Sequence, residues 1–396
     1  MVELKSICTE IKDGDWIESK DQSSEGIRLV QTGNIGIGKY LNKDDRAKFV
    51  TEETFSSLKC TEIFEGDILI SRLPTPVGRA CVFPNIQSRA ITAVDCTILR
   101  VNKELCIPKY FVYYTMSSMY LNQIDRFVAG TTRLRISRKN LEGIKIFLPE
   151  ISLQNKIVEV LDKAQALIDK RKEQIEALDE LVKSRFIEMF GDPIRNNMNW
   201  DIKKVGEISF VTKLAGFEYT QYINYQDEGE VIVVKGLNVK EKKLRLENVS
   251  YIDKETSDLL PRSQLKKNDL VMTYVGINIG DVAIVDENNR YHLAPNVAKI
   301  SLLDDNNINP VFMVNLLYMS RILFSSGATN TAKQALNMAR IRDIDIMIPP
   351  LELQKEFAIF YEQVDKLKFE METSLKELEY NFNSLMQKAF KGELFN

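Results

Sequence analysis

The sequence is poor in the side chains that most often carry catalysis or bind metal. Its 396 residues include a single histidine, His292, and five cysteines, which all lie in the first half and form no CxxC pair. One histidine without a cysteine cluster argues against a zinc site, and the absence of a nucleophile-elbow pattern argues against a Ser-His-Asp relay. His292 is expected at a strand edge or in a loop. The cysteines are expected to be free thiols in a reducing compartment, because a disulfide framework would recur in both halves.

Long apolar runs and an excess of basic charge are also missing. No segment approaches the roughly 18 uncharged apolar residues that span a bilayer. The N-terminus lacks the charged-then-apolar pattern of a secretory signal, so a cytoplasmic protein without membrane contact is expected. With 53 basic and 56 acidic residues, the net charge is −3. This balance counts against a protein that coats DNA through its phosphates, but it permits a local basic face.

Nucleotide-binding and methyltransferase motifs are absent as well. Gly33-Asn34-Ile35-Gly36-Ile37-Gly38 looks like a glycine-rich loop, but polar, turn-like residues follow it instead of a helix, so we expect a β-turn. No GxxxxGK[ST] occurs. Ile348-Pro349-Pro350-Leu351 lacks the amide or carboxylate that opens the Asn/Asp-Pro-Pro-aromatic motif of adenine methyltransferases. The chain is therefore predicted to be non-catalytic by itself and to hold no cofactor.

What the sequence does contain is a duplication. The segment around Leu153-Gln154 returns around Leu353-Gln354, and the two glutamines lie 354 − 154 = 200 residues apart. Three further pairs recur at nearly the same offset: Asp67 and Asp269, Asn34 and Asn238, Gly130 and Gly327. Solenoid repeats have periods of about 20–50 residues, so this unit is far too long for a solenoid. Two copies of a globular domain plus a helix are predicted.

Each copy is predicted to be a β-rich domain followed by a long helix. Short β-branched runs punctuated by Gly and Pro indicate strands, and a helix is expected after Pro108 and again after Pro310. After each Leu-Gln pair, apolar residues recur every three or four positions for about five heptads without Gly or Pro, which is typical of a coiled coil. The expected order is a β-rich domain over 1–150, a helix over 151–192, a second β-rich domain over 193–350 and a second helix over 351–396. This is an α+β fold with internal two-fold pseudosymmetry.

The two long helices are expected to bury their apolar stripes on each other in antiparallel orientation. The alternative is that each helix packs on its own domain. At about 1.5 Å per residue, helices of roughly 35 residues are about 50 Å long. The predicted helix–helix interface consists of Leu161, Leu167, Leu178, Phe186, Phe357, Val364, Leu367, Leu378, Phe382 and Leu385, with Ile168 as the alternative to Leu167.

Short motifs flank both helices at matching positions. They are Ile146-Phe147-Leu148-Pro149 with Leu153-Gln154, Ile346-Met347-Ile348-Pro349-Pro350 with Leu353-Gln354, and the tails Phe190-Gly191-Asp192 and Lys391-Gly392-Glu393-Leu394. In this order they resemble the specificity subunit of type I restriction-modification systems, and the resemblance covers nearly the whole chain. It implies that each β-rich domain is a target recognition domain that reads one half of a bipartite DNA target. The coiled coil would set the gap between the halves, which should be unlike because the two copies differ.

The same resemblance implies partners. Double-stranded DNA would be bound by the recognition domains, two methyltransferase subunits would dock along the helices, and two restriction or motor subunits could join them. S-adenosylmethionine, and ATP with Mg, would then be bound by those partner subunits.

Candidate DNA contacts lie in polar segments at matching places of the two copies. The best basic cluster spans residues 126–139, where Gly130-Thr131-Thr132 offers N–H groups and hydroxyls to phosphate and the arginines suit guanine O6 and N7. Its counterpart, residues 327–337, is richer in amides, which suit adenine. The predicted contacts are Thr32, Asn34, Arg72, Arg126, Thr131, Thr132, Arg133, Arg135, Arg138, Lys139, Lys235, Asn238, Tyr274, Thr329, Asn330, Lys333, Gln334 and Asn337.

Several alternatives stay open at this point. The basic cluster could be an ordinary solvated face. Trp16 could stack on a base or sugar, although a buried core position is expected for it, and Trp200 is expected in the core of the second domain. The whole chain could instead be a coiled-coil adaptor whose β-rich domains bind proteins, or a fused nuclease or methyltransferase. The adaptor hypothesis does not explain why both copies place a Gly-Thr-rich polar segment at the same position.

Overall fold

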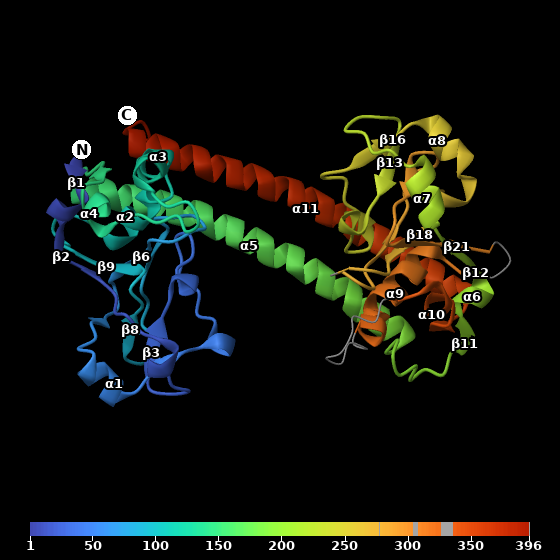
Figure 1. Cartoon of the computed structure of the whole chain (residues 1–396), viewed down its shortest axis with the longest axis horizontal. Coiled ribbons are helices and arrows are strands. Elements are labelled where there is room, and N and C mark those ends of the chain that lie inside the picture. Colours follow the sequence, from blue (N-terminus) through green and yellow to red (C-terminus); the bar gives the residue numbers. More distant parts are fainter. Residues whose placement is uncertain (277, 304–307, 326–335, 396) are drawn as a thin grey trace. The chain divides into compact units, whose positions relative to one another are not determined.

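The computed structural model describes residues 1–276, 278–303, 308–325 and 336–395, with only the backbone described over 322–325 (Figure 1). The chain divides into two compact units. The first comprises Met1–Glu173 and Glu372–Asn396, and the second comprises Gln174–Met371. Each long helix therefore contributes one part to each unit.

The first unit contains two four-stranded sheets. One has the order β2-β9-β6-β7 and is antiparallel throughout, while the other has the order β4-β3-β8-β5, with β3 and β8 parallel. Side chains alternate across β6, so Leu69 faces the core between the sheets and Ile68 and Ile70 face the helices. The strands are β2 (Cys8–Asp13), β3 (Ile27–Val30), β4 (Phe49–Val50), β5 (Glu62–Ile63), β6 (Ile68–Ser71), β7 (Ala80–Val82), β8 (Ala90–Thr92) and β9 (Cys96–Val101).

Short helices and a two-stranded ribbon complete the first unit. Pro108 occupies the first turn of a helix, as expected, and Tyr110, Phe111 and Tyr114 of this helix are buried in the same core as the long helices. These elements are α1 (Glu52–Ser57), α2 (Pro108–Tyr114), α3 (Ser118–Phe127), α4 (Arg138–Glu142), the pair β1 (Val2–Glu3) and β10 (Lys145–Ile146), and the 3-10 turns η1 (Leu4–Ile7), η2 (Ser19–Asp21), η3 (Thr32–Asn34) and η4 (Asp44–Arg46).

The second unit repeats this topology. Its sheets have the orders β12-β21-β18-β19 and β16-β13-β20-β17, and β13 and β20 are parallel, as are β3 and β8. The identical strand orders confirm the duplication. The strands are β11 (Asp201–Lys204), β12 (Ser209–Lys213), β13 (Val231–Val234), β14 (Val239–Lys240), β15 (Lys243–Leu244), β16 (Ser250–Ile252), β17 (Gln264–Leu265), β18 (Leu270–Thr273), β19 (Val282–Ile284), β20 (Tyr291–Leu293), β21 (Val297–Leu302) and β22 (Asp345–Ile348). The helical elements are α6 (Val205–Ile208), α7 (Gly216–Tyr222), α8 (Lys254–Leu259), α9 (Pro310–Ser325), α10 (Met338–Arg342), η5 (Gly236–Asn238) and η6 (Pro261–Ser263).

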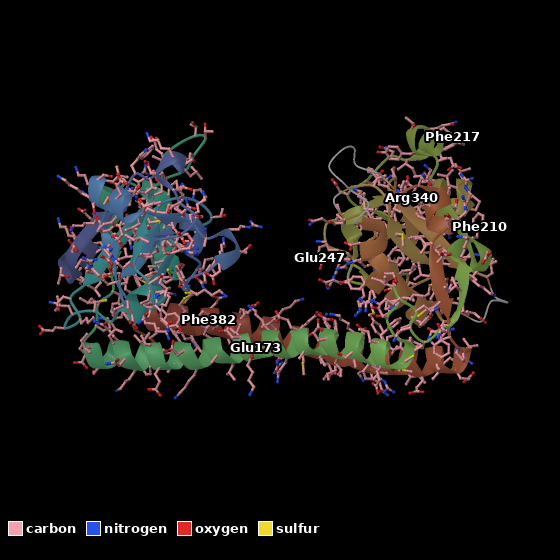
Figure 2. The ribbon with its side chains drawn as sticks, turned by 90° about the horizontal axis from the view of Figure 1, so that it is seen from below. Glu173, Phe210, Phe217, Glu247, Arg340 and Phe382 are labelled. Atoms are coloured by element: carbon pink, nitrogen blue, oxygen red, sulfur yellow. The ribbon has the colours of Figure 1, made fainter. Side chains whose placement is uncertain are left out.

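The long helices are α5 (Ile151–Phe190) and α11 (Leu351–Lys391), and they pack on each other in antiparallel orientation. Ion pairs show the direction: within the second unit Asp179 pairs with Lys368 at 2.7 Å and Arg185 with Glu356 at 2.9 Å, so numbers rise along one helix as they fall along the other. Figure 2 shows Phe382 of α11 beside α5 in the first unit.

The long helices pack on their own domains as well as on each other, so both packing modes considered from the sequence occur. The ring of Tyr110 lies 5.5 Å from that of Phe390, and Phe186 stacks on Phe312 at 5.7 Å. The buried or half-buried members of the predicted interface are Leu161, Leu178, Phe186, Phe357, Val364, Leu378, Phe382 and Leu385.

Two predicted interface residues need correction. Leu167 is 56% exposed, whereas its neighbour Ile168 is 3% exposed and lies in the core. Successive helical residues differ by about 100° in direction, so only one of the two can face the partner helix. Leu367 is 42% exposed, because the buried stripe passes from Val364 to the half-buried Met371.

The repeated glutamines explain why the Leu-Gln motif occurs at the start of both long helices. Gln154 and Gln354 are fully buried. Gln154 Oε1 accepts a hydrogen bond from the N–H of Ile107 at 2.9 Å, and Gln354 Oε1 accepts one from the N–H of Asn309 at 2.9 Å. Each side chain therefore ties a long helix to the segment that starts α2 or α9.

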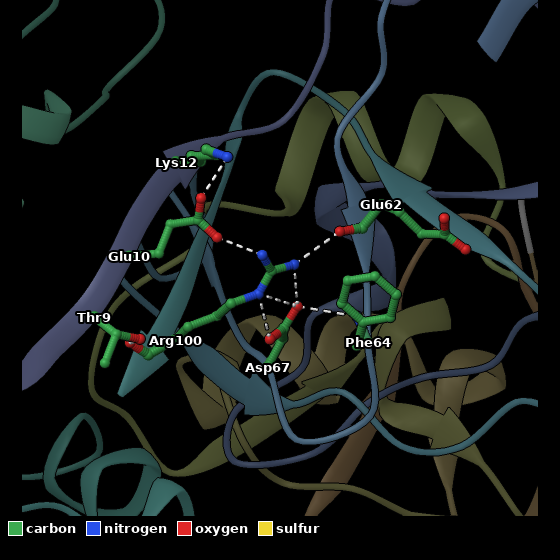
Figure 3. A network of polar contacts seen from close by, with 7 residues as sticks. All are labelled: Thr9, Glu10, Lys12, Glu62, Phe64, Asp67 and Arg100. Carbon is green, nitrogen blue, oxygen red and sulfur yellow. Dashed lines mark hydrogen bonds and ion pairs between the residues drawn. The ribbon is translucent and has the colours of Figure 1, made fainter. Parts of the chain in front are cut away.

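The repeated aspartates hold the turn before β6 and β18. Asp67 Oδ2 accepts from the N–H of Phe64 at 2.9 Å, and Asp269 Oδ2 accepts from that of Lys266 at 2.7 Å. In the first unit a charge network is added, which Figure 3 shows: Arg100 donates to Asp67 at 3.0 Å, pairs with Glu10 and stacks over the Phe64 ring.

Three sequence expectations about single residues can be compared with the structure. Trp200 packs on the core of the second unit, as predicted, and donates its indole N–H to the carbonyl of Phe190 at 2.9 Å. The buried position expected for Trp16 is wrong, because its side chain is 70% exposed. His292 is not at a strand edge or in a loop: it lies in β20, an inner strand, where burial lowers its pKa.

The glycine-rich segment after Asn34 forms a turn, as predicted, with a bridge between Ile35 and Tyr40. All five cysteines are free thiols. Within the described ranges, no helix combines the length and the apolar character needed to cross a membrane.

Candidate nucleic-acid interface

The predicted contacts of the first unit come together where several strands end. Thr32 and Asn34 follow β3, Arg72 follows β6, and Asp95 lies in the connection between β8 and β9. Backbone hydrogen bonds join these segments: the N–H of Arg72 donates to the carbonyl of Asp95 at 2.9 Å. We call this region, built from residues 32–34, 72–79, 92–96 and 126–139, the polar end of the first unit.

The basic cluster forms an exposed loop with a fixed base. The backbones of Ala129 and Arg135 exchange hydrogen bonds of 3.0 and 2.9 Å, and Ile136, fully buried, anchors the loop beneath them. Gly130 has φ +113°, and a Cβ there would lie 2.4 Å from the carbonyl oxygen of Arg133, so only glycine fits. The exposed members of the predicted set are Arg126, Thr131, Thr132, Arg133, Arg135, Arg138 and Lys139.

Two carboxylates position the arginines of this loop. Asp95 pairs with Arg133 at 3.0 Å and with Arg135 at 3.1 Å, so one negative charge serves two positive ones. Asp13 lies 3.3 Å from Arg72 and 3.9 Å from Arg138. The loop therefore keeps an excess of positive charge on its surface, while its guanidinium groups are held in place before any ligand arrives.

Arg72 and Asn34 do not have the surface positions that the sequence interpretation gave them. Arg72 is 4% exposed, and its guanidinium is used by Asp13 and by the carbonyl of Val94. Asn34 is 8% exposed and closes its own turn, with its side-chain amide bonded to the carbonyl of Leu41 at 2.9 Å. Both residues shape the polar end rather than presenting side chains at its surface.

Arg79 is a buried residue that the sequence interpretation missed. Its guanidinium donates to the carbonyls of Thr32 at 2.7 Å, Ile35 at 2.6 Å and Leu73 at 2.8 Å. It thereby fixes the turn that carries the half-buried Thr32 to the loop after β6. No pattern in the sequence distinguishes it from a surface arginine, because its acceptors are backbone carbonyls, which any residue supplies.

The described residues at the equivalent end of the second unit form a pocket, and the counterpart of the basic loop lies largely outside them. A pocket of about 680 Å³ opens between η5, the end of β18 and the connection between β20 and β21. Lys235 lies at its wall, with its ammonium 4.4 Å from the ring centre of Tyr225 and 2.6 Å from Ser250 Oγ. The lining residues that can bond to a ligand are Tyr219, Tyr225, Lys235, Thr273, Asn278 and Asn296.

The other predicted contacts of the second unit have different positions. Asn238 is fully buried and holds its turn through the carbonyl of Arg245 at 2.8 Å, as Asn34 does in the first unit. Tyr274 is 8% exposed and lies under the ammonium of Lys213. Asn337 is exposed and caps α10 by accepting from the N–H of Arg340. Thr329, Asn330, Lys333 and Gln334 lie outside the described residues.

The side chains at both polar ends suit recognition of a ligand. Among the residues that the structure describes, no three His, Cys, Asp or Glu side chains gather as a metal site would require. Arginine forks and amides are groups that read base edges. Among the described residues, the first unit offers mainly cations, and the pocket of the second unit offers Lys235 with aromatic and amide groups.

Comparison with known proteins places this arrangement. The family profile described as "Type I restriction modification DNA specificity domain" matches residues 1–178 and 197–380. The EcoBI specificity subunit of Escherichia coli is 23% identical, over 79% of this chain and 70% of that protein. The StySPI specificity subunit of Salmonella potsdam is also 23% identical, over 93% of this chain and 82% of its own length.

Solved structures share the fold. A chain from a study titled "Structural basis underlying complex assembly and conformational transition of the type I R-M system" has a TM-score of 0.60 at 16% identity, covering 99% of this chain and 97% of its own. The type I restriction-modification S subunit from M. genitalium has a TM-score of 0.55 at 13% identity, covering 98% and 95%.

Proposed function

We propose, because the chain belongs to the type I restriction-modification DNA specificity family, that it is the DNA-reading subunit of such a system. Each unit reads one half of a bipartite duplex target. The paired helices α5 and α11 set the gap between the halves. The family match confirms the resemblance seen in the sequence. Its relatives are specificity subunits, so the chain is a non-catalytic component of its complex.

One observation carries this proposal most strongly. Two units with the same strand order carry chemically different side chains at matching described positions of their polar ends, such as Arg72 against Tyr274 and Arg79 against Asp281. Identical scaffolds with unlike polar ends fit a protein that reads two unlike short sequences. The exposed loop of the basic cluster, residues 126–139, is called the arginine loop below. Its guanidinium groups suit guanine, whose O6 and N7 accept a guanidinium fork. The tyrosines and amides of the second unit suit stacking and adenine contact.

The acidic total charge suits a subunit that shares DNA binding with its partners. With a net charge of −3, the chain has no overall excess of positive charge to attract the phosphates of DNA. Two methyltransferase subunits docked along α5 and α11, and two restriction or motor subunits, would supply further phosphate contacts. S-adenosylmethionine, and ATP with Mg, would be bound by those subunits, and the complex would act in the cytoplasm.

A binding selection tests the proposal. The full chain, purified with a type I methyltransferase subunit of its host, is mixed with a library of random duplexes, and bound duplexes are sequenced. The proposal predicts two short constant sequences that differ from each other and are separated by unread base pairs of fixed number. Enrichment of a single contiguous sequence would contradict the proposal that each unit reads a separate half of the target. Absence of any enrichment would favour the adaptor hypothesis.

A further inference from the structure

Each unit exposes one large aromatic side chain at the same place in its topology. Among the described residues, four aromatic side chains are more than 60% exposed, and Phe369 and Tyr380 of α11 are two of them. The others are Trp16, which is 70% exposed, and Phe217, which is 68% exposed. Trp16 lies three residues after β2. Phe217 lies four residues after β12, which is the equivalent strand of the second unit.

The backbone before Trp16 is built into the polar end of the first unit. The N–H of Asp15 donates to the carbonyl of Thr92 at 2.8 Å, and that of Gly14 donates to the carbonyl of Cys96 at 2.9 Å. A Cβ on Gly14 would lie 2.3 Å from the Thr92 oxygen, so glycine is required for this close approach. The segment therefore runs along the connection that carries Asp95, the carboxylate that holds Arg133 and Arg135.

The environment of the Trp16 ring favours an apolar contact over a phosphate contact. Its indole N–H donates to Glu18 at 3.3 Å, and the other oxygen of that carboxylate pairs with Lys20 at 2.9 Å. The carboxylate repels phosphate, whereas the ring faces remain exposed. An aromatic face beside this polar end suits the sugars and the apolar base edges of a duplex, such as the thymine methyl group.

Phe217 lies on α7, the helix whose Tyr219 lines the pocket of the second unit with Lys235. Residues two apart lie on opposite faces of a helix, so Phe217 points to solvent beside the pocket and not into it. Figure 2 shows Phe217 at the surface of its unit. Glu218 pairs with Arg262 at 3.0 Å and accepts from the N–H of Ala215 at 2.9 Å, so the start of the helix is fixed and the ring is held outward.

The geometry points to Trp16 and Phe217 as a matched pair of aromatic DNA contacts, one beside each polar end, that pack against sugars and exposed base edges of the duplex. This inference deepens the proposed function and rests on it. It adds two residues outside the arginine loop and the pocket, and it assigns to them the apolar part of the contact. Loss of either ring should weaken binding without changing the number of phosphates neutralised.

Substitution separates this role from a structural one. Trp16→Ala and Phe217→Ala, in the full chain assembled with its methyltransferase, should each reduce affinity for the selected duplex by about 5- to 100-fold, the range expected for one lost apolar side-chain contact. The slope of affinity against salt should stay unchanged. Trp16→Phe and Phe217→Tyr should retain most of the affinity. Leu259→Ala, at a side chain that is 66% exposed on α8, is the matched control and should have no effect.

A spectroscopic readout identifies the partner directly. The chain contains two tryptophans, so 5-fluorotryptophan gives two fluorine resonances, which the Trp16→Phe variant assigns. Addition of the selected duplex should shift the Trp16 resonance, while that of the core residue Trp200 stays in place. A shift on adding methyltransferase alone, with no further change on adding duplex, would overturn the inference in favour of a protein contact. So would unchanged affinity in both alanine variants, provided that the wild-type complex binds. A wild-type complex that prefers no duplex would instead reject the proposed function.

Discussion

At the scale of single residues, buried polar side chains determine how the polar ends are held. Arg72, Arg79 and Asn34 are charged or polar, yet each is less than 10% exposed and bonds to a carboxylate or to backbone carbonyls. A polar residue type usually indicates a surface position, so the sequence alone placed Arg72 and Asn34 outside. The ion pair of Arg72 with Asp13 joins residues 59 positions apart (72 − 13), and no local pattern indicates such a pair.

The arginine loop yields the first prediction. Arg133→Ala and Arg135→Ala should each weaken DNA binding and lower the salt slope by about one, because each removes one cation from the phosphate and base surface. Electrophoretic binding assays at several salt concentrations measure both quantities. Lys163→Ala, at an exposed position of α5 paired with Glu159, is the control for a general loss of charge. Unchanged affinity and slope in both variants would remove the loop from the interface.

The buried glutamine at the start of α5 yields the second prediction. Gln154→Leu keeps the volume but leaves the N–H of Ile107 and the carbonyls of Leu105 and Pro149 without their partner. The free energy of unfolding should fall by about 2–4 kcal/mol, the cost of several unmet buried polar groups. Chemical denaturation measures it.

Gln165→Leu, on the surface of the same helix, is the control and should change the free energy of unfolding by no more than about 0.5 kcal/mol. Its side chain bonds only to Asp169, at 3.0 Å, among the contacts described. Equal losses in the two variants would show that the buried hydrogen bonds of Gln154 do not explain the repeated motif.

At the scale of elements, the long helices and several strands were predictable, and the pairing of strands was not. Periodicity alone identified α5 and α11, and β-branched runs identified β13 and β18. Strand order depends on contacts between distant segments, which no local pattern encodes. Periodicity also left Leu167 and Ile168 as alternatives, because two adjacent apolar residues fit the heptad equally well. Trp16 was placed wrongly because residue type alone does not report burial.

The hairpin β14–β15 yields the third prediction. Lys242, in its turn, places its ammonium 5.3 Å from the ring centre of Tyr318 on α9 and 5.0 Å from that of Tyr361 on α11. Burial lowers the pKa of Lys242 to about 8, with Lys368 and Lys243 adding to the effect and Asp179 and Asp365 opposing it. The unfolded value is about 10.4, so the unfolded chain holds this proton more tightly.

The sign follows from proton binding. Between pH 8 and about 10.4 the unfolded state binds more protons than the folded state, so the contribution of Lys242 to stability rises with pH and is lowest below pH 8. The free energy of unfolding of the wild type, relative to that of Lys242→Met, should rise by up to about 3 kcal/mol over this pH window. Denaturation of both proteins at matched pH values checks it. A difference that is constant with pH would show that the ammonium is not desolvated by the hairpin.

At the scale of the whole molecule, α5 and α11 together are proposed to set the number of unread base pairs between the two halves of the target. Removing one heptad from each helix, residues 172–178 and 371–377, keeps the apolar stripes in phase. It shortens the pair by about 10 Å, or about three base pairs. The selected target should lose about that many unread base pairs. Replacing the same residues by a heptad with equivalent apolar positions should leave the gap unchanged. An unaltered gap after the deletion would contradict the role of the helices.

The proposal that this chain reads the DNA target is tested most sharply by comparing the methylation pattern of the host genome with and without it. The account predicts a bipartite motif with methylated adenine and two unlike halves, which disappears when the chain is deleted and returns when it is restored. Loss of the arginine loop should then affect the reading of one half only. A methylation pattern that is the same in the presence and absence of the chain would contradict the account.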